Sequence, residues 1–541
     1  MIYQVYPRSF QDSSGDGIGD LEGIRRRLDH LVWLGVDAVW ISPFYPSPMV
    51  DFGYDISDYT DVDPLFGSLA DFDRLLAEAH RRGLRVILDL VPNHTSDQHR
   101  WFRDARSSRS SEHRDWYLWR DPAPDGGVPN NWMSEFGGSA WTWDATTAQY
   151  YYHAFAPEQP DLNWRNPEVR RAMFDVMRFW LDRGVDGFRI DVMWHMVKDA
   201  QFRDNSPNPE YVEGAMSPYQ RVIPEHSTDQ PEVHEVVAQM RSVLDEYDDR
   251  LMIGEIYLPV DRLVDYYGRE GAGAHLPFNF HLISTPWEAR ELEAMIDRYE
   301  GALPEHAWPN WVLGNHDQPR IASRLGAAQA RVAAMLLLTL RGTPTIYYGD
   351  ELGMHDLEIP TGLAVDVREK RVPGQGLGRD PARTPMQWDR GPHAGFTTGT
   401  PWLPLPPDAG DRSVEAERNA SGSMLALYHA LLRLRRSEPA LAVGSYTPLP
   451  AEGSLLAYLR TYEGDRFAIV LNIGEETVSW PVPDGLAGGW IVLSTSRERR
   501  ERWTGDEVQL DGDEGVIIRV PTSVPGPHRM CQPANATGTS V

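Results

Sequence analysis

Short apolar runs alternate with amphipathic stretches along most of the chain. Several runs end in a polar or charged cluster and are followed by helical periodicity, an alternation typical of a parallel sheet covered by helices. The amphipathic stretches predict helices at residues 21–34, 69–82, 167–183, 232–247 and 327–340. The apolar runs predict eight strands, the number that closes a (β/α)8 TIM barrel of the α/β class. These strands are expected at residues 2–6, 38–41, 85–91, 187–192, 251–256, 278–280, 311–313 and 345–348.

Three segments depart from this alternation. Residues 95–164, after the third predicted strand, are dense in Trp, Tyr, Gly and Asp and lack helical periodicity, and so long an insertion normally serves a function. Residues 354–411 are rich in Gly and Pro and should lie over the same end of the barrel. Short apolar runs between Gly and Asp turns at 441–520 predict antiparallel strands. The predicted division is a barrel at 1–94 and 165–438, an inserted domain B at 95–164, a C-terminal antiparallel β domain at 439–524 and a disordered tail at 525–541.

The composition argues against several classes of partner. A formal net charge of −27 at pH 7 repels phosphate backbones and anionic lipid surfaces, so we expect neither a nucleic-acid nor a membrane partner. The single cysteine, Cys531, excludes an internal disulfide and fits a reducing compartment. The chain shows no signal-like start and no apolar stretch of about 18 residues, which favours a cytoplasmic protein. The 19 Trp and 22 Tyr residues hint at carbohydrate, because sugar rings stack on aromatic faces exposed in a cleft.

Polar residues gather where four of the predicted strands end. Taken singly, these clusters have structural explanations: Asp191 can pair with Arg189, and a buried histidine such as His94 is more often a satisfied core residue. Reactive groups of a TIM barrel lie at the carboxyl ends of its strands, however, and several carboxylates there without matching lysines are hard to explain as structure, because unpaired buried charge is costly. The clusters are Asp89 with Asn93 and His94, Arg189 with Asp191, Glu255 alone, and Asn315 with His316 and Asp317.

These groups meet the chemical needs of glycosidic cleavage. One carboxylate attacks the anomeric carbon, a second with a raised pKa protonates the leaving oxygen, and polar groups stabilise the oxocarbenium-like transition state. Arg189 precedes Asp191 by two strand positions, so it points to the same side of the sheet and can hold Asp191 ionised. The pattern therefore predicts a glycosidase site.

The groups sit in recognisable motifs. These are DLVPNH at 89–94, QPDLN at 159–163, GFRIDV at 187–192, GE at 254–255 and NHD at 315–317. In sequence and order they resemble the motifs of the α-amylase clan, glycoside hydrolase family thirteen, and within it the oligo-1,6-glucosidase and α-glucosidase group. The resemblance implies Asp191 as nucleophile, Glu255 as general acid/base, Asp317 as the transition-state stabiliser that grips the 2- and 3-hydroxyls of glucose, His94 and His316 as hydrogen-bonding histidines of that subsite, and Arg189 as the partner of the nucleophile.

The resemblance extends to residues that close off the glucose subsite. It implies that Asp51 and Arg383 together bind the terminal 4-hydroxyl and that Tyr54 stacks under the ring, so that only a chain end is admitted. The alternative for Asp51 and Arg383 is a simple surface salt bridge. Val192, directly after the nucleophile position, matches the residue that accompanies cleavage of α-1,6 bonds in this group, which implies that isomaltose is accepted as well as maltose.

A loop near the start of the chain spaces oxygen ligands at alternate positions around glycines, which suits a hard cation. The resemblance supports Ca²⁺ or Mg²⁺ in a structural role, although Ser14 replaces the usual Asn. The alternative is an acidic turn that caps a helix. The implied ligands are the side chains of Asp12, Ser14, Asp16 and Asp20 and the carbonyl of Ile18.

These features together imply a retaining, exo-acting α-glucosidase that removes terminal non-reducing glucose from disaccharides and short oligosaccharides. Small α-glucosides would be its partners, and a monomer or homodimer its oligomeric state. A trehalose synthase or other transglucosylase forms the same glucosyl-enzyme and remains an open alternative. Inactive relatives that partner amino-acid transporters need a membrane anchor and lack carboxylates, whereas this chain retains all three.

Overall fold

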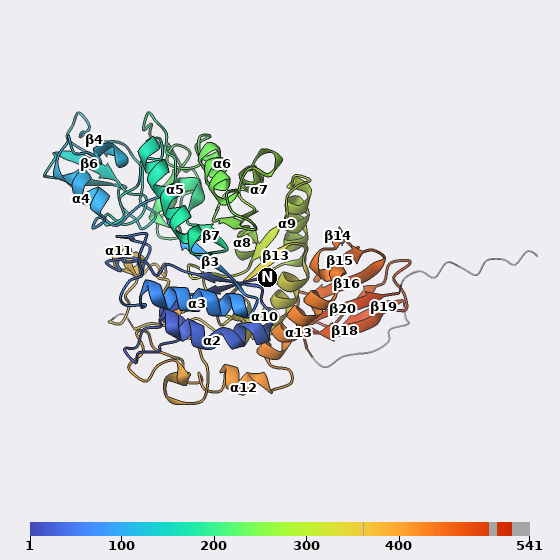
Figure 1. Cartoon of the computed structure of the whole chain (residues 1–541). Helices are drawn as coiled ribbons and strands as arrows, with labels where there is room; N and C mark the ends of the chain where they lie inside the picture. Colours follow the sequence, from blue (N-terminus) through green and yellow to red (C-terminus); the bar gives the residue numbers. More distant parts are fainter. Residues whose placement is uncertain (361, 497–505, 522–541) are drawn as a thin grey trace, which may run out of the picture.

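A (β/α)8 barrel forms the centre of the computed structural model, which describes residues 1–360, 362–496 and 506–521 (Figure 1). Its strands form one parallel sheet in the order β11-β10-β7-β3-β2-β1-β13-β12. Within the described residues no ladder joins the two end strands, so the barrel is nearly closed, and the predicted fold class is confirmed. The strands are β1 (Ile2–Val5), β2 (Ala38–Ile41), β3 (Arg85–Leu90), β7 (Gly187–Ile190), β10 (Leu251–Gly254), β11 (Leu276–Pro277), β12 (Asn310–Val312) and β13 (Thr343–Tyr347).

The sixth strand is the one whose predicted position is wrong. Every other predicted run overlaps its strand, whereas the run at 278–280 begins just after β11 has ended. Phe278 and Phe280 are buried in an apolar cluster with inward-facing residues of other strands, including Trp40 and Ile253. Phe278 and Phe280 are therefore apolar because they pack inside the barrel and not because they belong to a strand. The strand itself, β11, has only two residues, which is too short for a recognisable sequence pattern.

Helices cover the outside of the barrel, each burying an apolar stripe against the sheet (Figure 1). Asp20 caps the first long helix by accepting a hydrogen bond from Gly23 N, and Gly35 ends it at φ 100°, a conformation that favours glycine. The last predicted helix begins earlier than expected, at Ile321, and contains Gly326 in a non-helical conformation. The main barrel helices are α2 (Leu21–Leu34), α3 (Leu69–Arg81), α5 (Pro167–Asp182), α6 (Val233–Leu244), α9 (Ala289–Ala302) and α10 (Ile321–Thr339), with short helices α1 (Pro7–Phe10), α7 (Val260–Leu263) and α8 (His281–Ser284).

Helix α10 is long and apolar enough to cross a membrane by length and composition alone. Most of its apolar window is buried inside the protein, and the helix packs between α13 (Met424–Ser437) and the C-terminal strands. Thr339 at its end hydrogen-bonds to Tyr458 of that β domain at 2.5 Å. Because a buried core helix passes the same test, this helix is weak evidence for a membrane span.

The inserted segment, domain B, projects from the barrel end at which β3 and β7 finish (Figure 1). It holds a three-stranded sheet in the order β4-β6-β5 and a helix, α4. Trp101, Phe102 and Ala105 form the buried face of α4, which is too short to give a periodic signal in the sequence. The elements are α4 (Arg100–Ser107), β4 (Trp119–Arg120), β5 (Trp141–Asp144) and β6 (Gln149–Tyr152).

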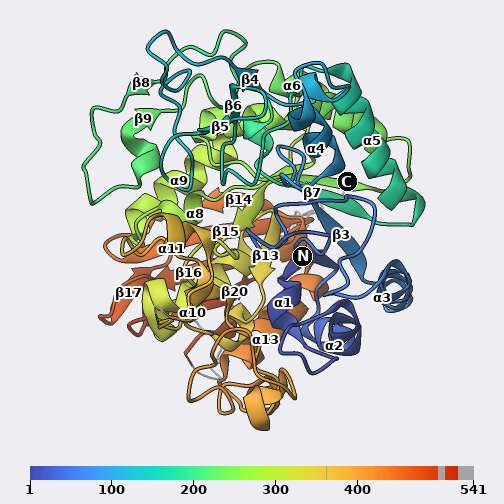
Figure 2. The ribbon, with the colours of Figure 1, turned by 90° about the vertical axis from the view of Figure 1, so that its left-hand side faces the viewer.

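A second excursion from the barrel, which the sequence did not indicate, follows β7 at residues 199–232. It contains the two-stranded ribbon of β8 (Ser206–Pro207) and β9 (Val222–Ile223), and it lies beside domain B (Figure 2). Trp132 Nε1 of domain B donates to Arg203 O of the excursion at 2.8 Å. The two segments therefore form one continuous wall above the barrel.

The chain after β13 first crosses the barrel mouth as loops with a short helix, α11 (Val367–Arg371), and then leaves the barrel. The predicted antiparallel β domain follows on the side away from domain B (Figure 1). It contains a five-stranded sheet in the order β14-β15-β16-β20-β18 and the pair β17-β19. Cys531 and the predicted tail at 525–541 lie outside the described residues. The elements are α12 (Val414–Arg418), α14 (Pro439–Ala442), β14 (Ser445–Pro448), β15 (Leu455–Tyr462), β16 (Asp465–Asn472), β17 (Val478–Pro481), β18 (Trp490–Ser494), β19 (Glu507–Leu510) and β20 (Gly515–Val520).

Candidate active site

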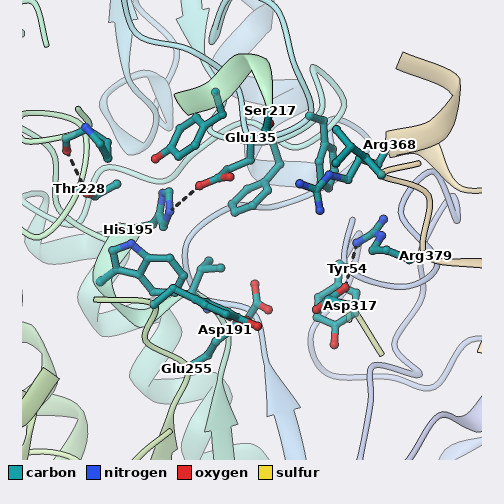
Figure 3. A pocket seen from close by; sticks show the side chains of 18 of the residues that line it. Tyr54, Glu135, Asp191, His195, Ser217, Thr228, Glu255, Asp317, Arg368 and Arg379 are labelled. Carbon is teal, nitrogen blue, oxygen red and sulfur yellow. Dashed lines mark hydrogen bonds and ion pairs between the residues drawn. The ribbon is translucent and has the colours of Figure 1, made fainter. Parts of the chain in front are cut away.

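A cavity of about 570 Å³ opens at the carboxyl ends of the barrel strands (Figure 3). Its floor comes from the strand ends, and its walls come from domain B, the excursion after β7 and the segment after β13. Pockets of this position and size are where TIM-barrel enzymes bind small ligands. The predicted site residues that line it are Asp51, Tyr54, His94, Asp191, Val192, Glu255, His316 and Asp317.

Arg189, on β7, holds three carboxylates together beneath the cavity. Its guanidinium, fully buried, contacts Asp89 Oδ1 at 2.6 Å and Asp191 Oδ1 at 2.8 Å through Nη1, and Glu255 Oε2 at 2.5 Å through Nη2. Asp89 is fixed further by Tyr54 OH, which donates to Oδ2 at 3.0 Å. Because one guanidinium bridges Asp191 and Glu255, the two predicted reacting groups are neighbours at the cavity floor.

The charges of this cluster do not balance. Burial raises the pKa of Asp89 to about 6, and burial also raises the pKa values of Asp191 and Glu255, with Arg189 acting in the opposite direction on all three groups. Three buried carboxyls share one positive charge, and mutual repulsion further opposes ionising all of them. Burial and mutual repulsion therefore favour holding a proton on the cluster to a higher pH than on free carboxyls, and the rise in pKa is larger for Asp191 than for Glu255.

The turn after β7 places Glu255 against the strand that leads to Asp191. Val192 N donates to Glu255 Oε2 at 2.9 Å, and Glu255 N donates to Ile190 O at 3.0 Å. Val192 adopts φ 37° and ψ 49°, a left-handed conformation that is strained for a β-branched residue. Backbone strain of this kind persists only where surrounding contacts hold it. Here the strained residue is the one whose backbone N–H donates to Glu255 and orients it.

Asp317 stands across the cavity from Asp191 (Figure 3). Burial alone would raise the pKa of its carboxyl, but the positive charges of Arg379 and Arg383 outweigh burial and hold the pKa well below its usual range. His316 stacks on Tyr54 with ring centroids 5.3 Å apart, and burial lowers its pKa well below the usual value. Asp317 is therefore a fixed negative charge that can accept hydrogen bonds from sugar hydroxyls.

His94 lies at the same end of the cavity as a neutral hydrogen-bonding group. Burial lowers its pKa to about 4, and its Nε2 lies 3.2 Å from Gln159 Nε2 and 3.2 Å from Tyr54 O. Gln159, from the QPDLN motif, also donates to Asp51 Oδ2 at 3.2 Å. This motif thus fastens domain B to the closed end of the cavity.

The predicted pairing of Asp51 with Arg383 is wrong. Asp51 Oδ1 contacts Arg379 Nη2 at 2.5 Å, whereas Arg383 is fully buried below the cavity and contacts Asp317 Oδ1 at 2.9 Å and His316 O at 2.7 Å. Arg379 also contacts Asp366 Oδ1 at 2.6 Å. The two arginines stand one helical turn apart at η7 (Asp380–Arg383), so the segment was identified but the side chain that faces Asp51 was not.

The predicted cation loop closes at the start of α2. Asp12 and Asp20 are buried, and no described Arg, Lys or His forms an ion pair with either. Burial would raise the pKa of Asp12, but hydrogen bonds from Thr397 and the loop backbone lower it. Two buried anions without a cationic partner fit a hard cation by charge, although no group of three or more acidic, His or Cys side chains converges there within the described residues.

The remaining ligands of that loop are engaged locally. Ser14 Oγ donates to Asp12 Oδ1 at 3.1 Å, and Asp16 Oδ1 accepts from Ile18 N at 2.9 Å. Asp20 caps α2, so the helix-capping alternative is also present in the structure. Any cation here would be held by few carboxylates together with hydroxyl and carbonyl oxygens.

A family model described as "Alpha amylase, catalytic domain" matches residues 4–444, which include domain B and all of the barrel except the start of β1. The chain belongs to the α-amylase family. The carboxylate cluster on Arg189, the site that sequence motifs and geometry both indicate, lies inside the matched region.

Within the α-amylase family the chain is similar to proteins of more than one activity. A probable alpha-glucosidase of Rhizobium meliloti (strain 1021) is 43% identical over 503 residues, covering 89% of this chain and 90% of the relative. An oligo-1,6-glucosidase of Heyndrickxia coagulans is 40% identical over 533 residues, covering 91% and 94%.

Two solved structures share nearly the whole fold. The alpha-glucosyl transfer enzyme XgtA superposes with a TM-score of 0.91 at 41% identity, covering 96% of this chain and 98% of that chain. The trehalulose synthase MutB from Pseudomonas mesoacidophila MX-45 gives 0.88 at 36% identity, covering 96% and 98%.

Several residues of this α-amylase-family pocket were missed by the sequence motifs. They come from segments outside these motifs, and three of them stand near a sequence signal: Trp194 and His195 follow GFRIDV almost directly, and Arg379 stands four residues before Arg383. These additional lining residues are Glu135, Phe155, Trp194, His195, Tyr219, Tyr257, Arg368 and Arg379.

Proposed function

We propose that this protein is a retaining, exo-acting α-glucosidase that hydrolyses terminal non-reducing α-linked glucose of disaccharides and short oligosaccharides. It is a glycoside hydrolase of the α-amylase family, and relatives 38–43% identical to it are named alpha-glucosidase and oligo-1,6-glucosidase. The observation that carries the proposal is the pairing of Asp191 and Glu255 on one guanidinium at the floor of a small pocket. Carboxyl groups about 5–5.5 Å apart characterise the retaining mechanism.

The roles follow from position and charge. Asp191, bound to Arg189, attacks the anomeric carbon and forms a β-glucosyl ester as the glycosidic C–O bond breaks. Glu255 gives its proton to the leaving oxygen and then takes one from the water that hydrolyses the ester. Asp317, held ionised, stabilises the oxocarbenium-like transition state by binding hydroxyls of the sugar ring.

The exo mode of attack rests on the closed end of the pocket. Arg379 joins Asp51, Asp317 and Asp366 in one buried network, and Gln159 ties Asp51 to domain B. A chain extending past the 4-hydroxyl of the bound glucose would have to break this network. Asp51 and Arg379, rather than Asp51 and Arg383, are the pair placed to bind that hydroxyl.

The test is product analysis from maltose followed by proton NMR. Free glucose released first as the α-anomer supports the proposal, and β-glucose as the first product overturns retention. Accumulation of trehalose or of transfer products in place of glucose would instead support a trehalose synthase or other transglucosylase. That second candidate is favoured by the similarity to XgtA, an alpha-glucosyl transfer enzyme.

For the loop at Asp12 to Asp20 we propose that one Ca²⁺ or Mg²⁺ binds in a structural role, supported by the two buried anions described above. Metal analysis of the purified protein, with and without chelator, tests it together with the melting temperature. One bound equivalent whose removal lowers the melting temperature supports the cation, whereas no bound metal and an unchanged melting temperature overturn it.

We further propose a cytoplasmic protein, monomeric or homodimeric, that binds neither nucleic acid nor membrane. The support is the net charge of −27 and the single cysteine. Size-exclusion chromatography with light scattering tests the oligomeric state, and fractionation of the native host tests the location.

A further inference from the structure

One polar wall of the pocket has no part in the cleavage chemistry proposed above. Glu135 comes from domain B, and His195 stands four residues after the nucleophile; both line the cavity. Figure 3 shows them on the side of the cavity away from Arg379. Because Arg379 and Asp51 close the glucose end, this wall faces the space left for the other half of the substrate.

His195 is buried but lacks hydrogen bonds. Its side chain is 1% exposed, and neither ring nitrogen has a hydrogen-bond partner within the described residues. The contact from Nε2 to Glu135 Oε1 is 3.5 Å, which is longer than an N–H···O hydrogen bond. Buried polar groups are almost always paired in folded proteins, so unpaired nitrogens beside a pocket indicate a ligand group that completes them.

A hydroxyl is the group that fits both partners. The Glu135 carboxylate accepts hydrogen bonds, and a neutral imidazole both donates and accepts, so one hydroxyl placed between them can donate to Glu135 and bond His195. Glu135 is about one quarter exposed and lines the cavity, where the Tyr219 hydroxyl also contacts it. The wall therefore suits a polyhydroxy compound better than an apolar one.

An aromatic surface lies next to this wall. Trp194 contacts Tyr257 with ring centroids 5.8 Å apart, and Tyr257 stacks on Phe280 at 4.2 Å. Tyr257 is partly exposed and follows the proposed acid Glu255 by two residues. A sugar leaving the protonated glycosidic oxygen would thus meet aromatic faces for its ring and polar groups for its hydroxyls.

We propose that Glu135 and His195 bind hydroxyls of the leaving-group sugar and make the enzyme prefer sugars over aryl groups as leaving groups. This inference rests on the proposed α-glucosidase function and specifies which substrates that site selects. A site built to hydrogen-bond a substrate hydroxyl discriminates strongly against an analogue that lacks it.

The test compares kcat/KM for maltose with kcat/KM for p-nitrophenyl α-glucoside, whose aryl leaving group has no hydroxyls. For Glu135→Gln and for His195→Phe we expect a fall of about tenfold or more on maltose, and a change of less than about threefold on the aryl glucoside. Glu112→Gln, an exposed residue of domain B, is the matched control and should change neither value. The melting temperatures of the variants check that they still fold. His195→Gln, which keeps a polar side chain at this buried position, is the conservative variant.

Each other outcome is decisive. An equal fall on both substrates assigns the pair a merely structural role, and no fall on maltose shows that the pair does not bind the leaving sugar; both overturn the inference. If the unmodified protein hydrolyses neither substrate, the proposed α-glucosidase function itself fails. That result is separate from any effect of the two substitutions.

Discussion

At the scale of single residues, the site depends on how one arginine is shared. Arg189 alone serves Asp89, Asp191 and Glu255, so each carboxyl is stabilised less than it would be in its own ion pair. This shortage of positive charge favours keeping a proton on the cluster. The motifs identify each of these residues, but the sharing is a property of their positions in space.

The first prediction concerns the acid. Glu255→Gln removes the transferable proton, so kcat/KM on maltose should fall by about 10³-fold. Formation of the glucosyl ester should fall less for p-nitrophenyl α-glucoside, because that leaving group departs without protonation; a burst of p-nitrophenol measures it.

Because burial raises the pKa of Glu255, activity of the unmodified enzyme should be lost as pH rises through that pKa, and this alkaline limb should be absent in Glu255→Gln. An equal loss on both substrates with an unaltered pH profile would contradict the acid role.

The second prediction concerns linkage. Val192 lines the pocket and its amide orients Glu255, so its methyl groups lie where the leaving sugar meets the acid. Val192→Ala should lower the isomaltose-to-maltose ratio of kcat/KM by about tenfold, an effect of roughly 1.4 kcal/mol that pocket methyl groups can supply. Initial rates on both disaccharides measure it, and an unchanged ratio would show that Val192 does not set linkage choice.

At the scale of elements, the segments between strands build most of the pocket, while the strands and helices position them. Domain B is fastened by Gln159 and by the bridge between His94 and Asp161. The excursion after β7 is joined to domain B through Trp132. These connections fix the positions of loop residues that line the pocket, which a site for one sugar ring requires.

A third prediction belongs to the first long helix. Asp20→Ala removes the cap of α2 and should destabilise the protein by about 1 kcal/mol, seen as a lower melting temperature. Asp20→Asn keeps a capping oxygen and should cost less. If chelator lowers the melting temperature of the unmodified protein but not of Asp20→Ala, the residue also serves the cation; equal melting temperatures for all three proteins would contradict both roles.

At the scale of the whole molecule, four distant parts of the chain close around one cavity. The barrel supplies the reacting carboxylates, and the segment after β13 supplies Arg379, which closes the end. The C-terminal β domain packs on the opposite side, away from the cavity (Figure 1). The arrangement therefore suits short substrates that enter by one chain end.

The fourth prediction follows from this closure. Reducing-sugar release from polymeric starch should be limited to glucose from its few non-reducing ends and be negligible beside the rate on maltose, because internal segments of a polymer cannot pass Asp51 and Arg379. Amylose with a blocked non-reducing end is the control and should be inert. Fragments longer than glucose among the products would contradict exo attack.

The sequence by itself determined the barrel and the reacting groups. Burial on both faces gives parallel strands such as β2 and β3 continuous apolar runs, and chemistry restricts their ends to residues such as Asp191 and Glu255. Both constraints act on residues that are neighbours in the chain, so the sequence alone shows them. Only the tertiary structure decided that Arg379 rather than Arg383 faces Asp51, and that Glu135 meets His195. Such pairs join residues far apart in the chain, and their geometry depends on how loops pack, which no periodicity or spacing records.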